Sequence, residues 1–403
     1  MQDAEIALLL ETSERLISDT SVDFHRYLYE NIDWSEDLCC IKGPKGTGKT
    51  TLMLQRIKEE FGENTDKVVY FSLDHVWFAD HKPIDAVDYF YKNGFTHLFI
   101  DEVHHCPEWS QFIKSVTDSY PGLKVVYSGS SILKLDTGRA DLSRRQTEYC
   151  LKGLSFREFL EYEGVLSRPA IDLGELKRSH RKIAADICRE VKILPLFKRY
   201  LKHGYYPFYK KSPLHFTDRL VEVVNTVLTV DLPAVEGVTP PTVRKARKML
   251  MVLAKDCPQQ PNMSALYREL ETERNMGIRL LEALERAELF AGIDSGSMKL
   301  KHLSRPEKIF LGDANLMNAL VNQPDVGAVR ETYFVNQLRA AGHVVQAPAK
   351  GDFIVDEDTL FEIGGVGKGF GQIKDVPDSY VANDDTEIGI GNKIPLWLFG
   401  FLY

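Results

Sequence analysis

The stretch that decides the fold runs from residue 43 to residue 50 and reads Gly43-Pro44-Lys45-Gly46-Thr47-Gly48-Lys49-Thr50. An apolar, strand-like segment at residues 38–41 precedes it, and a segment with helical apolar spacing follows it. Glycines between a strand and a helix let the backbone curl so that its N–H groups point at a phosphate, and the helix N-terminus adds partial positive charge. The pattern therefore predicts a phosphate-binding loop that holds a nucleoside triphosphate.

The residue types in this loop predict separate roles. The ammonium group of Lys49 suits the β- and γ-phosphates, and the hydroxyl of Thr50 is placed to bind Mg²⁺. No guanine-specific Asn-Lys-x-Asp motif is apparent in the chain. We expect the nucleotide to be held by nine consecutive residues: Gly43, Pro44, Lys45, Gly46, Thr47, Gly48, Lys49, Thr50 and Thr51.

A second apolar segment, residues 96–102, ends in the two acids Asp101 and Glu102. In a Walker B element the first carboxylate holds Mg²⁺, so Asp101 is the predicted second metal residue after Thr50. The next carboxylate can reach the water in line with the γ-phosphate and act as its base. Glu102 is therefore the predicted catalytic base. Lys49 is expected to take part in catalysis through its positive charge at the phosphates.

Further polar residues follow the next predicted strand, residues 123–128. Ser128 and Ser130 are candidates to sense the γ-phosphate, although serines at a strand end also cap helices or make turns. Arg139, Arg144 and Arg145 lie in a polar stretch that suits an arginine finger, and a solvated loop is the alternative.

Composition is that of an ordinary globular protein. The 403 residues are 44% hydrophobic and 27% charged, with a net charge of -8 that argues against broad attraction to nucleic acid. The amino-terminal apolar residues have helical spacing and are interrupted by acids, unlike a signal peptide, and no run is long enough to span a bilayer. We expect a cytoplasmic protein with six reduced cysteines. Residues 104–106, His-His-Cys, form a metal-like cluster, but adjacent side chains seldom converge on one ion.

Apolar periodicity divides the chain into five segments. Strands and helices alternate over residues 35–155, which predicts an α/β P-loop NTPase domain with a parallel sheet covered on both faces. A helical segment, residues 1–34, precedes it. A helical lid or connector is expected over 156–257 and a winged helix-turn-helix over 258–305. An α/β domain resembling a restriction endonuclease is expected over 306–403.

The last two segments raise the question of nucleic acid. Arginines in the second helix of the predicted winged helix are offset by glutamates, so a protein contact is at least as well supported as DNA binding. In the last segment, Glu331, Asp352 and Glu362 are the acids that a nuclease-like core uses to hold Mg²⁺. The lysine expected two residues after the last acid is replaced by Gly364, although Lys368 or Lys374 could supply a displaced amine. The simpler prediction is a nuclease-like fold without its activity.

The order of these elements resembles the bacterial and archaeal AAA-type ATPases that carry an AAA_14 domain followed by a DUF4143 domain. The resemblance rests on residues 43–50, 98–102 and 128–131, the box Ser155-Phe156-Arg157-Glu158-Phe159, and the terminal segment. It implies ATP as the nucleotide, a helical and winged-helix middle region and a nuclease-like carboxyl domain. The Ser-Gly-Arg that precedes the box in the family corresponds here to Ser143-Arg144-Arg145, which favours Arg144 or Arg145 over Arg139.

These observations predict an ATPase that requires Mg²⁺ and couples its nucleotide state to movement of the helical, winged-helix and carboxyl-terminal parts. Two alternatives stay open: a DNA-binding regulator gated by ATP, and an ATP-activated nuclease using the three acids of the last segment. The expected partners are ATP and a DNA or protein bound through the winged helix and carboxyl domain, with no membrane. The sequence leaves the oligomeric state undetermined.

Overall fold

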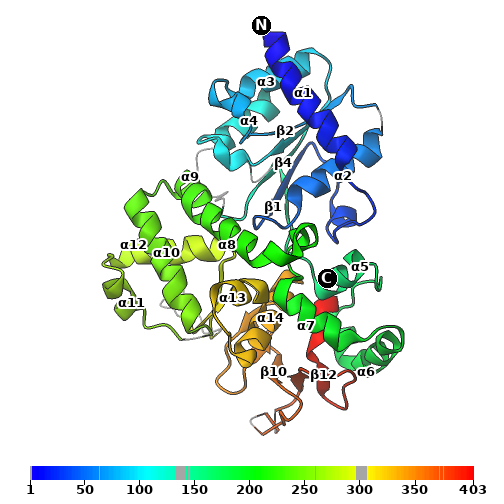
Figure 1. The fold of residues 1–403 in the computed structure, drawn as a ribbon, viewed down its shortest axis with the longest axis vertical. Helices are drawn as coiled ribbons and strands as arrows, with labels where there is room; N and C mark the ends of the chain where they lie inside the picture. The colour runs from blue at the N-terminus through cyan, green and yellow to red at the C-terminus, as the bar shows by residue number, and fades with distance from the viewer. Residues whose placement is uncertain are drawn as a thin grey trace. The chain divides into compact units, whose positions relative to one another are not determined.

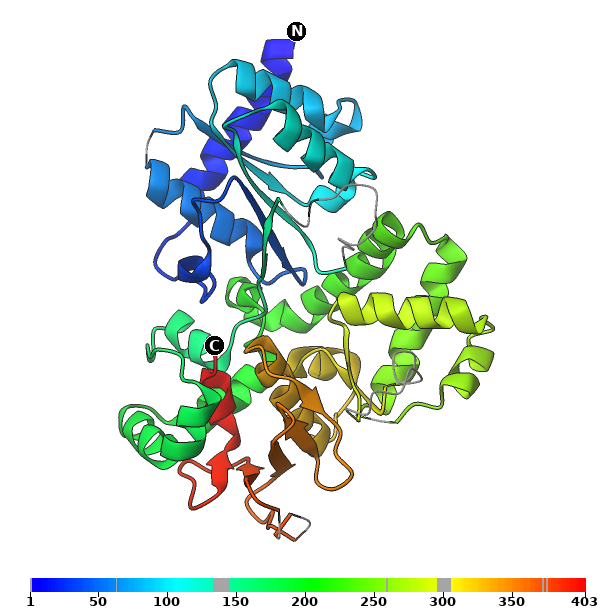
Figure 2. The same cartoon turned by 180° about the vertical axis from the view of Figure 1, so that it is seen from behind.

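A computed structural model describes residues 2–403 apart from 63, 133–141, 143, 144, 259, 296–305, 372 and 375. The chain divides into two compact units, which are described separately (Figures 1 and 2). The first comprises Met1–Lys152 and Thr226–Thr239, and the second comprises Gly153–Asn225 and Pro240–Tyr403. The chain thus leaves the first unit, returns to it for one short segment and leaves it again.

The first unit is built on a five-stranded sheet with the order β2-β3-β4-β1-β5. Every pair of neighbouring strands is parallel. This arrangement confirms the predicted α/β P-loop sheet, with β4 inserted between the strand of the glycine loop and the strand that ends in two acids. The strands are β1 (Leu38–Gly43), β2 (Val68–Ser72), β3 (His97–Asp101), β4 (Lys124–Ser130) and β5 (Thr147–Cys150).

Both faces of this sheet are buried, because alternate strand residues point to opposite sides. On β1, Cys39 and Ile41 pack in one core with the apolar residues of α2 (Lys49–Phe61). Leu38 and Cys40 belong to the opposite core, which includes residues of α3 (Pro83–Lys92) and α4 (Trp109–Ser119). Figure 1 shows α2 on one side of the sheet and α3 with α4 on the other.

The amino-terminal helix α1 (Gln2–Asp19) covers the edge of the sheet at β2. Its residues Ile6 and Leu9 join one core and Ile17 joins the other. The hydroxyl of Ser13 accepts a 2.9 Å hydrogen bond from the backbone N–H of Tyr70 in β2. The predicted amphipathic helix therefore packs against both cores of the first unit.

The second unit begins with helices, as the change of periodicity near residue 155 predicts. A capping box, in which Ser155 and Glu158 exchange hydrogen bonds with each other's backbone, starts the first of these helices. Phe156, Phe159 and Tyr200 form an aromatic cluster that holds the region together. The helices are α5 (Phe156–Tyr162), α6 (Leu173–Glu190), α7 (Ile193–His203) and α8 (Phe216–Thr226).

A helical group with a two-stranded ribbon follows the short excursion to the first unit. It contains α10 (Pro240–Lys255), α11 (Met263–Glu269) and α12 (Arg274–Arg286), and α12 packs on both of the other helices. Strands β6 (Phe290–Ile293) and β7 (Lys308–Leu311) pair in antiparallel fashion. The winged helix-turn-helix and the predicted domain boundaries on either side of it stay predictions.

The remainder of the second unit carries a five-stranded mixed sheet with the order β12-β11-β10-β9-β8. Helix α14 (Val326–Ala340) packs against β8 and β10, and α13 (Ala314–Leu320) packs against α14. The strands are β8 (Val345–Gln346), β9 (Phe353–Val355), β10 (Thr359–Gly364), β11 (Ser379–Asn383) and β12 (Lys393–Pro395).

The closing apolar run, residues 394–403, differs from the terminal core strand that its sequence predicts. We expected one buried strand, but β12 ends at Pro395 and Leu396–Phe401 continues as a buried 3₁₀ helix. Proline has no N–H to donate to a neighbouring strand, so pairing ends there. Burial of the run is as expected. Within the described part of the chain, none of the helices has both the length and the apolar character that crossing a membrane requires.

Candidate nucleotide-binding site

The loop between β1 and α2 has the sharply curled backbone that the glycines predict. Gly46 and Gly48 have φ values of +87° and +99°, which side-chain-bearing residues rarely adopt. Gly48 is the residue before α2, so the loop ends at a helix N-terminus. Gly43 is required for a different reason: a Cβ built there would lie 2.2 Å from the carbonyl oxygen of Leu151. The loop is thus packed against the segment that follows β5.

Lys49 folds back over this loop and is 5% exposed. Its Nζ donates hydrogen bonds to the carbonyl oxygens of Gly43, at 3.0 Å, and Pro44, at 3.1 Å. The loop carbonyls therefore hold the ammonium at the centre of the curl. A phosphate bound there would meet a full positive charge together with the N–H groups of the loop.

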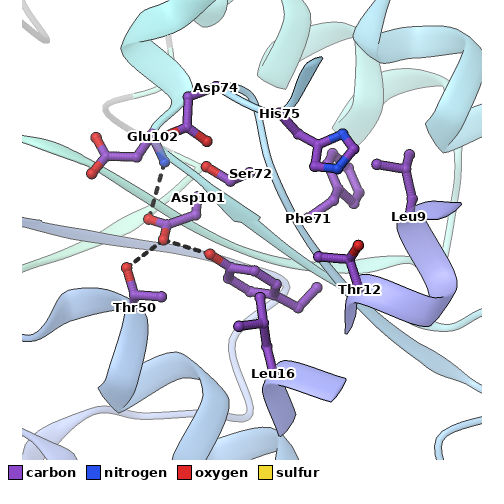
Figure 3. A pocket seen from close by; sticks show the side chains of 11 residues that line it. Leu9, Thr12, Leu16, Thr50, Phe71, Ser72, Asp74, His75, Asp101 and Glu102 are labelled. Carbon is purple, nitrogen blue, oxygen red and sulfur yellow. Dashed lines mark hydrogen bonds between the residues drawn. The ribbon is translucent and has the colours of Figure 1, made fainter. Parts of the chain in front are cut away.

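The carboxylate of Asp101 lies at the end of β3, where it is 2% exposed (Figure 3). Its Oδ2 accepts hydrogen bonds from Thr50 Oγ1 at 2.5 Å and from the Tyr70 hydroxyl at 2.8 Å. Burial, and then the charge of Asp101, raises the pKa of Tyr70, so this hydroxyl stays a donor. The two predicted metal residues thus touch each other, and a hydroxyl beside a carboxylate is the oxygen-only donor set that fits Mg²⁺.

Ser128, the predicted γ-phosphate sensor, is fully buried in β4 and bonds to the same carboxylate. Its hydroxyl donates to Asp101 Oδ1 and accepts from the backbone N–H of Glu102 at 3.3 Å. Ser130, the alternative sensor, is 3% exposed and its backbone N–H faces His104 Nδ1 at 3.5 Å. The structure therefore places Ser128 beside the two acids that end β3, and Ser130 beside His104.

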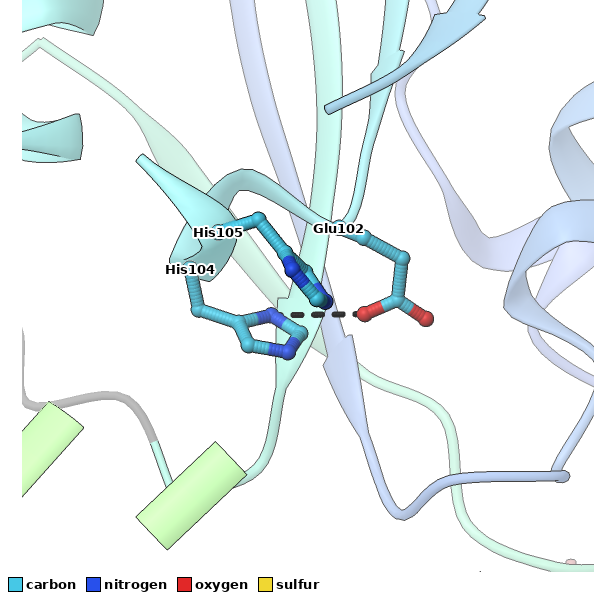
Figure 4. A group of neighbouring side chains, drawn as sticks. All are labelled: Glu102, His104 and His105. Atoms are coloured by element: carbon cyan, nitrogen blue, oxygen red, sulfur yellow. Dashed lines mark ion pairs between the residues drawn. The ribbon is translucent and has the colours of Figure 1, made fainter. Parts of the chain in front are cut away.

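Glu102, the predicted base, has a left-handed backbone with φ 54° and ψ 44°. Such a conformation is uncommon for a residue with a side chain and often marks a functional position. Its Oε2 lies 3.3 Å from Nδ1 of His104, whose side chain is fully buried (Figure 4). The sequence grouped His104 and His105 with Cys106 as a metal-like cluster; the structure instead brings both histidines within 4.8 Å of Glu102.

A cavity of about 260 Å³ opens beside these acids (Figure 3). Thr50, Asp101 and Glu102 line one part of it, and Leu9 and Leu16 of α1 line another. The acids that we expect to act on the nucleotide therefore border open space.

The predicted arginine fingers are only partly described. Arg139 and Arg144 lie outside the described residues. The half-exposed guanidinium of Arg145 forms an ion pair with Asp118 of α4. Hydrogen bonds from Lys114 and then from Arg145 hold the pKa of the Asp118 carboxyl below its ordinary value.

Two buried charged residues of this site were missed by the sequence interpretation. Arg26, which is 5% exposed, donates to the carbonyl oxygen of Thr47 in the glycine loop and, at 2.7 Å, to that of Lys152. Asp231, which is 1% exposed, lies 3.4 Å from His104 Nε2 and 3.9 Å from Lys45 Nζ. Neither residue stands in a motif. Asp231 ends an apolar helical segment, and that single acid is the one signal that could have pointed to it.

The predicted acids of the terminal segment also come together, within the second unit. Glu362 of β10 is 1% exposed and its Oε2 pairs with Lys368 Nζ at 2.9 Å. The same Nζ lies 3.9 Å from Asp352, and the charges of Asp352 and Lys368 act on Glu331 of α14. A Cβ at Gly364 would lie 2.6 Å from the Cβ of Lys368. The stem of Lys368 therefore fills the space beside the position where the expected lysine is missing.

The glycine loop, the acids at the end of β3 and the inserted strand β4 together define a P-loop nucleotide-binding domain. Residues 35–160 match the family model AAA_14, described as an AAA domain. This part of the chain is therefore similar to AAA domains and has a P-loop sheet. The model that matches downstream, over residues 194–326, is DUF8612, a domain of unknown function. The expected name DUF4143 is thus not supported, and DUF8612 takes its place.

Individual proteins are similar over larger parts of the chain. The uncharacterized protein MJ1637 of Methanocaldococcus jannaschii is 27% identical over 296 residues, which cover 68% of this chain and 60% of that protein. The match thus spans less than two thirds of that relative. AMPPCP-bound DnaA from Aquifex aeolicus is 18% identical, with a TM-score of 0.27 over 64% of this chain and 84% of that one. The Hsp104–ADP complex of S. cerevisiae is 16% identical, with a TM-score of 0.33 over 64% of this chain and 50% of that one. The fold assignment above rests on the strand order and not on these TM-scores.

Proposed function

We propose that the first unit binds ATP with Mg²⁺ and hydrolyses it. The observation that supports this most directly is the contact between Thr50 and Asp101, which puts a hydroxyl and a buried carboxylate side by side. Lys49 stands on the same helix turn as Thr50, and Glu102 follows Asp101 directly. One short region thus offers a phosphate cradle, a cation site and a base.

Each group has a defined part in this proposal. The loop of residues 43–51 would bind the phosphates through its backbone N–H groups, which Pro44 alone lacks, and through the ammonium of Lys49. Thr50 and Asp101 would hold the cation. Bound Mg²⁺ supplies positive charge that offsets the charge developing on the phosphate oxygens. Glu102 takes the proton of the attacking water, whose oxygen forms a bond to the γ-phosphorus as the bond to ADP breaks. Ser128 reports on the γ-phosphate through Asp101, and Arg144 or Arg145 serves as the finger.

We further propose that nucleotide state repositions the second unit. The chain passes between the units after residues 152, 225 and 239, so three connections carry a change at the nucleotide site to the helical, winged-helix and terminal parts. A DNA or protein partner would then bind through these parts.

The test of hydrolysis is the variant Glu102→Gln, which keeps the shape of the side chain and removes its basicity. We expect it to bind Mg-ATP with unchanged affinity and to lose turnover by at least about 100-fold, the lower range for a general base. Glu108→Gln, in the loop before α4, is a matched control and should behave like the parent. Turnover that persists in Glu102→Gln would remove Glu102 from the mechanism.

One observation favours a second activity, metal-dependent cleavage of a phosphodiester. Lys368 provides an amine beside Glu362 and Asp352, although the lysine at position 364 is missing. Among the described residues, the buried oxygen Oε1 of Glu362 has no hydrogen-bond partner, and Oε2 of Glu331 has only an ion pair with Lys308 at 3.5 Å. Both oxygens can therefore act as ligands of a cation. In the reaction, water would attack phosphorus and the P–O bond to the leaving nucleotide oxygen would break.

Supercoiled plasmid incubated with the parent protein and Mn²⁺ tests this second candidate. We expect nicking that Lys368→Ala and Glu362→Gln abolish. Lys374→Ala is the control, because Lys374 is exposed and was the other lysine available for the role. Plasmid that stays intact with the parent, with and without ATP, would exclude the activity and leave the ATPase proposal untouched.

A further inference from the structure

Asp231 reaches the nucleotide site on a turn with an unusual backbone. Val227–Asp231 is a π-helical turn between α8 and α9 (Leu232–Glu236). It belongs to Thr226–Thr239, the short segment with which the chain returns to the first unit. π-Helical turns are rare and frequently occur at functional sites, because they redirect a side chain that a regular helix would carry elsewhere.

The segment is anchored without any help from Asp231. Val235 of α9 packs against the first-unit core that contains Leu38 and Cys40, so an aliphatic side chain attaches the segment to the first unit. A buried carboxylate adds a desolvation cost to such an attachment, and an apolar residue of similar size would hold the segment at least as well. The presence of an acid at position 231 is therefore not explained by attachment of the segment to the first unit.

The surroundings of Asp231 indicate that reason. Its Oδ1 lies 3.4 Å from His104 Nε2 and 3.9 Å from Lys45 Nζ, and neither carboxylate oxygen has a partner in hydrogen-bonding geometry within the described part of the chain. Burial opposes ionisation, but His104, then Lys45 and then the side chain of Ser130 outweigh it and hold the pKa of Asp231 below its ordinary value. An anion is thus kept within reach of one imidazole and one loop lysine.

His104 connects this anion to Glu102. Its Nε2 faces Asp231 and its Nδ1 faces Glu102 Oε2 at 3.3 Å. A carboxylate beside one ring nitrogen attracts that side of the ring and so fixes the direction of the imidazole, and thereby the position of the other nitrogen. The three side chains form a row in which Asp231 can set the orientation of Glu102 without touching it.

We propose that Asp231 is a positioning residue of the ATPase site and holds His104 in the orientation that places the Glu102 carboxylate for proton transfer. This inference rests on the proposed hydrolysis of ATP. It also gives Thr226–Thr239 a role, because the segment whose two ends continue into the second unit carries the residue that sets the base. Displacing the segment would then lower turnover without removing the nucleotide.

The test compares kcat, KM and nucleotide affinity of the full-length parent with those of Asp231→Asn and His104→Gln. We expect kcat to fall roughly tenfold or more in each, because a misplaced base loses part of its usual contribution. KM and the affinity for Mg-ATP should change by less than about threefold, since the phosphate contacts are intact. Unchanged nucleotide affinity also shows that the variants are folded. Asp218→Asn, on a side chain that is 84% exposed, is the matched control.

A double-variant cycle separates positioning from two unrelated losses. If Asp231 acts through His104, the double variant loses no more activity than the more damaged single variant, whereas independent effects multiply. A parent that hydrolyses ATP while Asp231→Asn keeps its kcat overturns this inference alone. Multiplicative losses overturn it as well. A parent that binds ATP without any turnover overturns both this inference and the proposed hydrolysis.

Discussion

Thr50 and Asp101 are 51 positions apart in the chain and share a 2.5 Å hydrogen bond. They meet because both stand at the carboxyl edge of one parallel sheet, Thr50 just after the loop that follows β1 and Asp101 at the end of β3. Tyr70 and Ser128, from the strands on either side of β3, bond to the same carboxylate. Three separate stretches of sequence thus converge on one buried acid in a fourth.

Replacing Lys49 tests the phosphate cradle. The Lys49→Ala variant removes the charge held between the carbonyl oxygens of Gly43 and Pro44. Hydrogen bonds to charged groups contribute about 1.5–3 kcal/mol, so affinity for Mg-ATP should fall by roughly 10- to 100-fold in calorimetry. Lys92→Ala, on a side chain that is 70% exposed, should bind like the parent. Equal affinities of parent and Lys49→Ala would contradict the proposed site.

Arg26 is predicted to act as a clamp on the glycine loop. The Arg26→Ala variant removes this donor from the buried carbonyl oxygen of Thr47 and from the partly buried carbonyl oxygen of Lys152. We expect weaker nucleotide binding and a loss of unfolding free energy of about 1–3 kcal/mol. Binding isotherms and denaturant unfolding measure the two effects, with exposed Arg15→Ala as the control. Loss of stability with full affinity would show that Arg26 supports the fold and not the loop.

Gly43 tests the close approach between the loop and the end of β5. A methyl group in Gly43→Ala would lie 2.2 Å from the Leu151 carbonyl oxygen, so backbone must move. Such overpacking costs about 1–3 kcal/mol, and thermal or denaturant unfolding should show it. Gly369→Ala, where a Cβ meets nothing within 4 Å, is the control and should change little. A stable Gly43→Ala with normal binding would mean that the contact yields easily.

The buried carboxyl group of Asp313 should make the free energy of unfolding depend on pH. This acid caps α13, accepts a hydrogen bond from Tyr206, and burial raises its pKa to about 7. Because the folded state binds the proton more tightly than the unfolded state, the contribution to stability is complete below about pH 4 and declines between about pH 4 and 7. Above pH 7 this contribution is lost, which lowers the free energy of unfolding by on the order of 4 kcal/mol.

The variant Asp313→Asn isolates that dependence. Asn keeps an oxygen for the helix cap and cannot ionise, so the parent should lose stability relative to the variant as pH rises from 5 to about 8. Asp325→Asn, at the exposed N-cap of α14, is the matched control. Denaturant midpoints at several pH values provide the comparison. A difference that does not change with pH would contradict the raised pKa.

How far the sequence predicts this molecule depends on whether a feature is local. The glycine loop and the strand that ends in Asp101 are short continuous patterns, and parallel strands necessarily bring their carboxyl ends to one edge. The sequence therefore predicted the sheet and the neighbours Thr50 and Asp101. It also predicted the helical character of the region after residue 155.

Features that depend on packing between distant parts of the chain could not be predicted from the sequence. Arg26 and Asp231 reach the loop from distant positions, and nothing next to either residue marks its destination. Lys368 illustrates a related limit of sequence motifs. A motif specifies how far apart residues stand in the sequence, whereas a site requires only that their side chains lie close together in the folded protein. In the sequence, Gly364 occupies the position at which a lysine is expected. In the structure, the absence of a side chain at Gly364 leaves the space that the side chain of Lys368 occupies.

The hydrogen bond that the backbone N–H of Tyr70 donates to Ser13 determines where this protein can be shortened. Strand β2 is the outermost strand of its sheet, and α1 shields it although the family match begins only at residue 35. A fragment cut to that match would present an unpaired strand as a template for strands of other molecules. We expect such a fragment to self-associate through β2, an edge that the first helix shields in the longer chain.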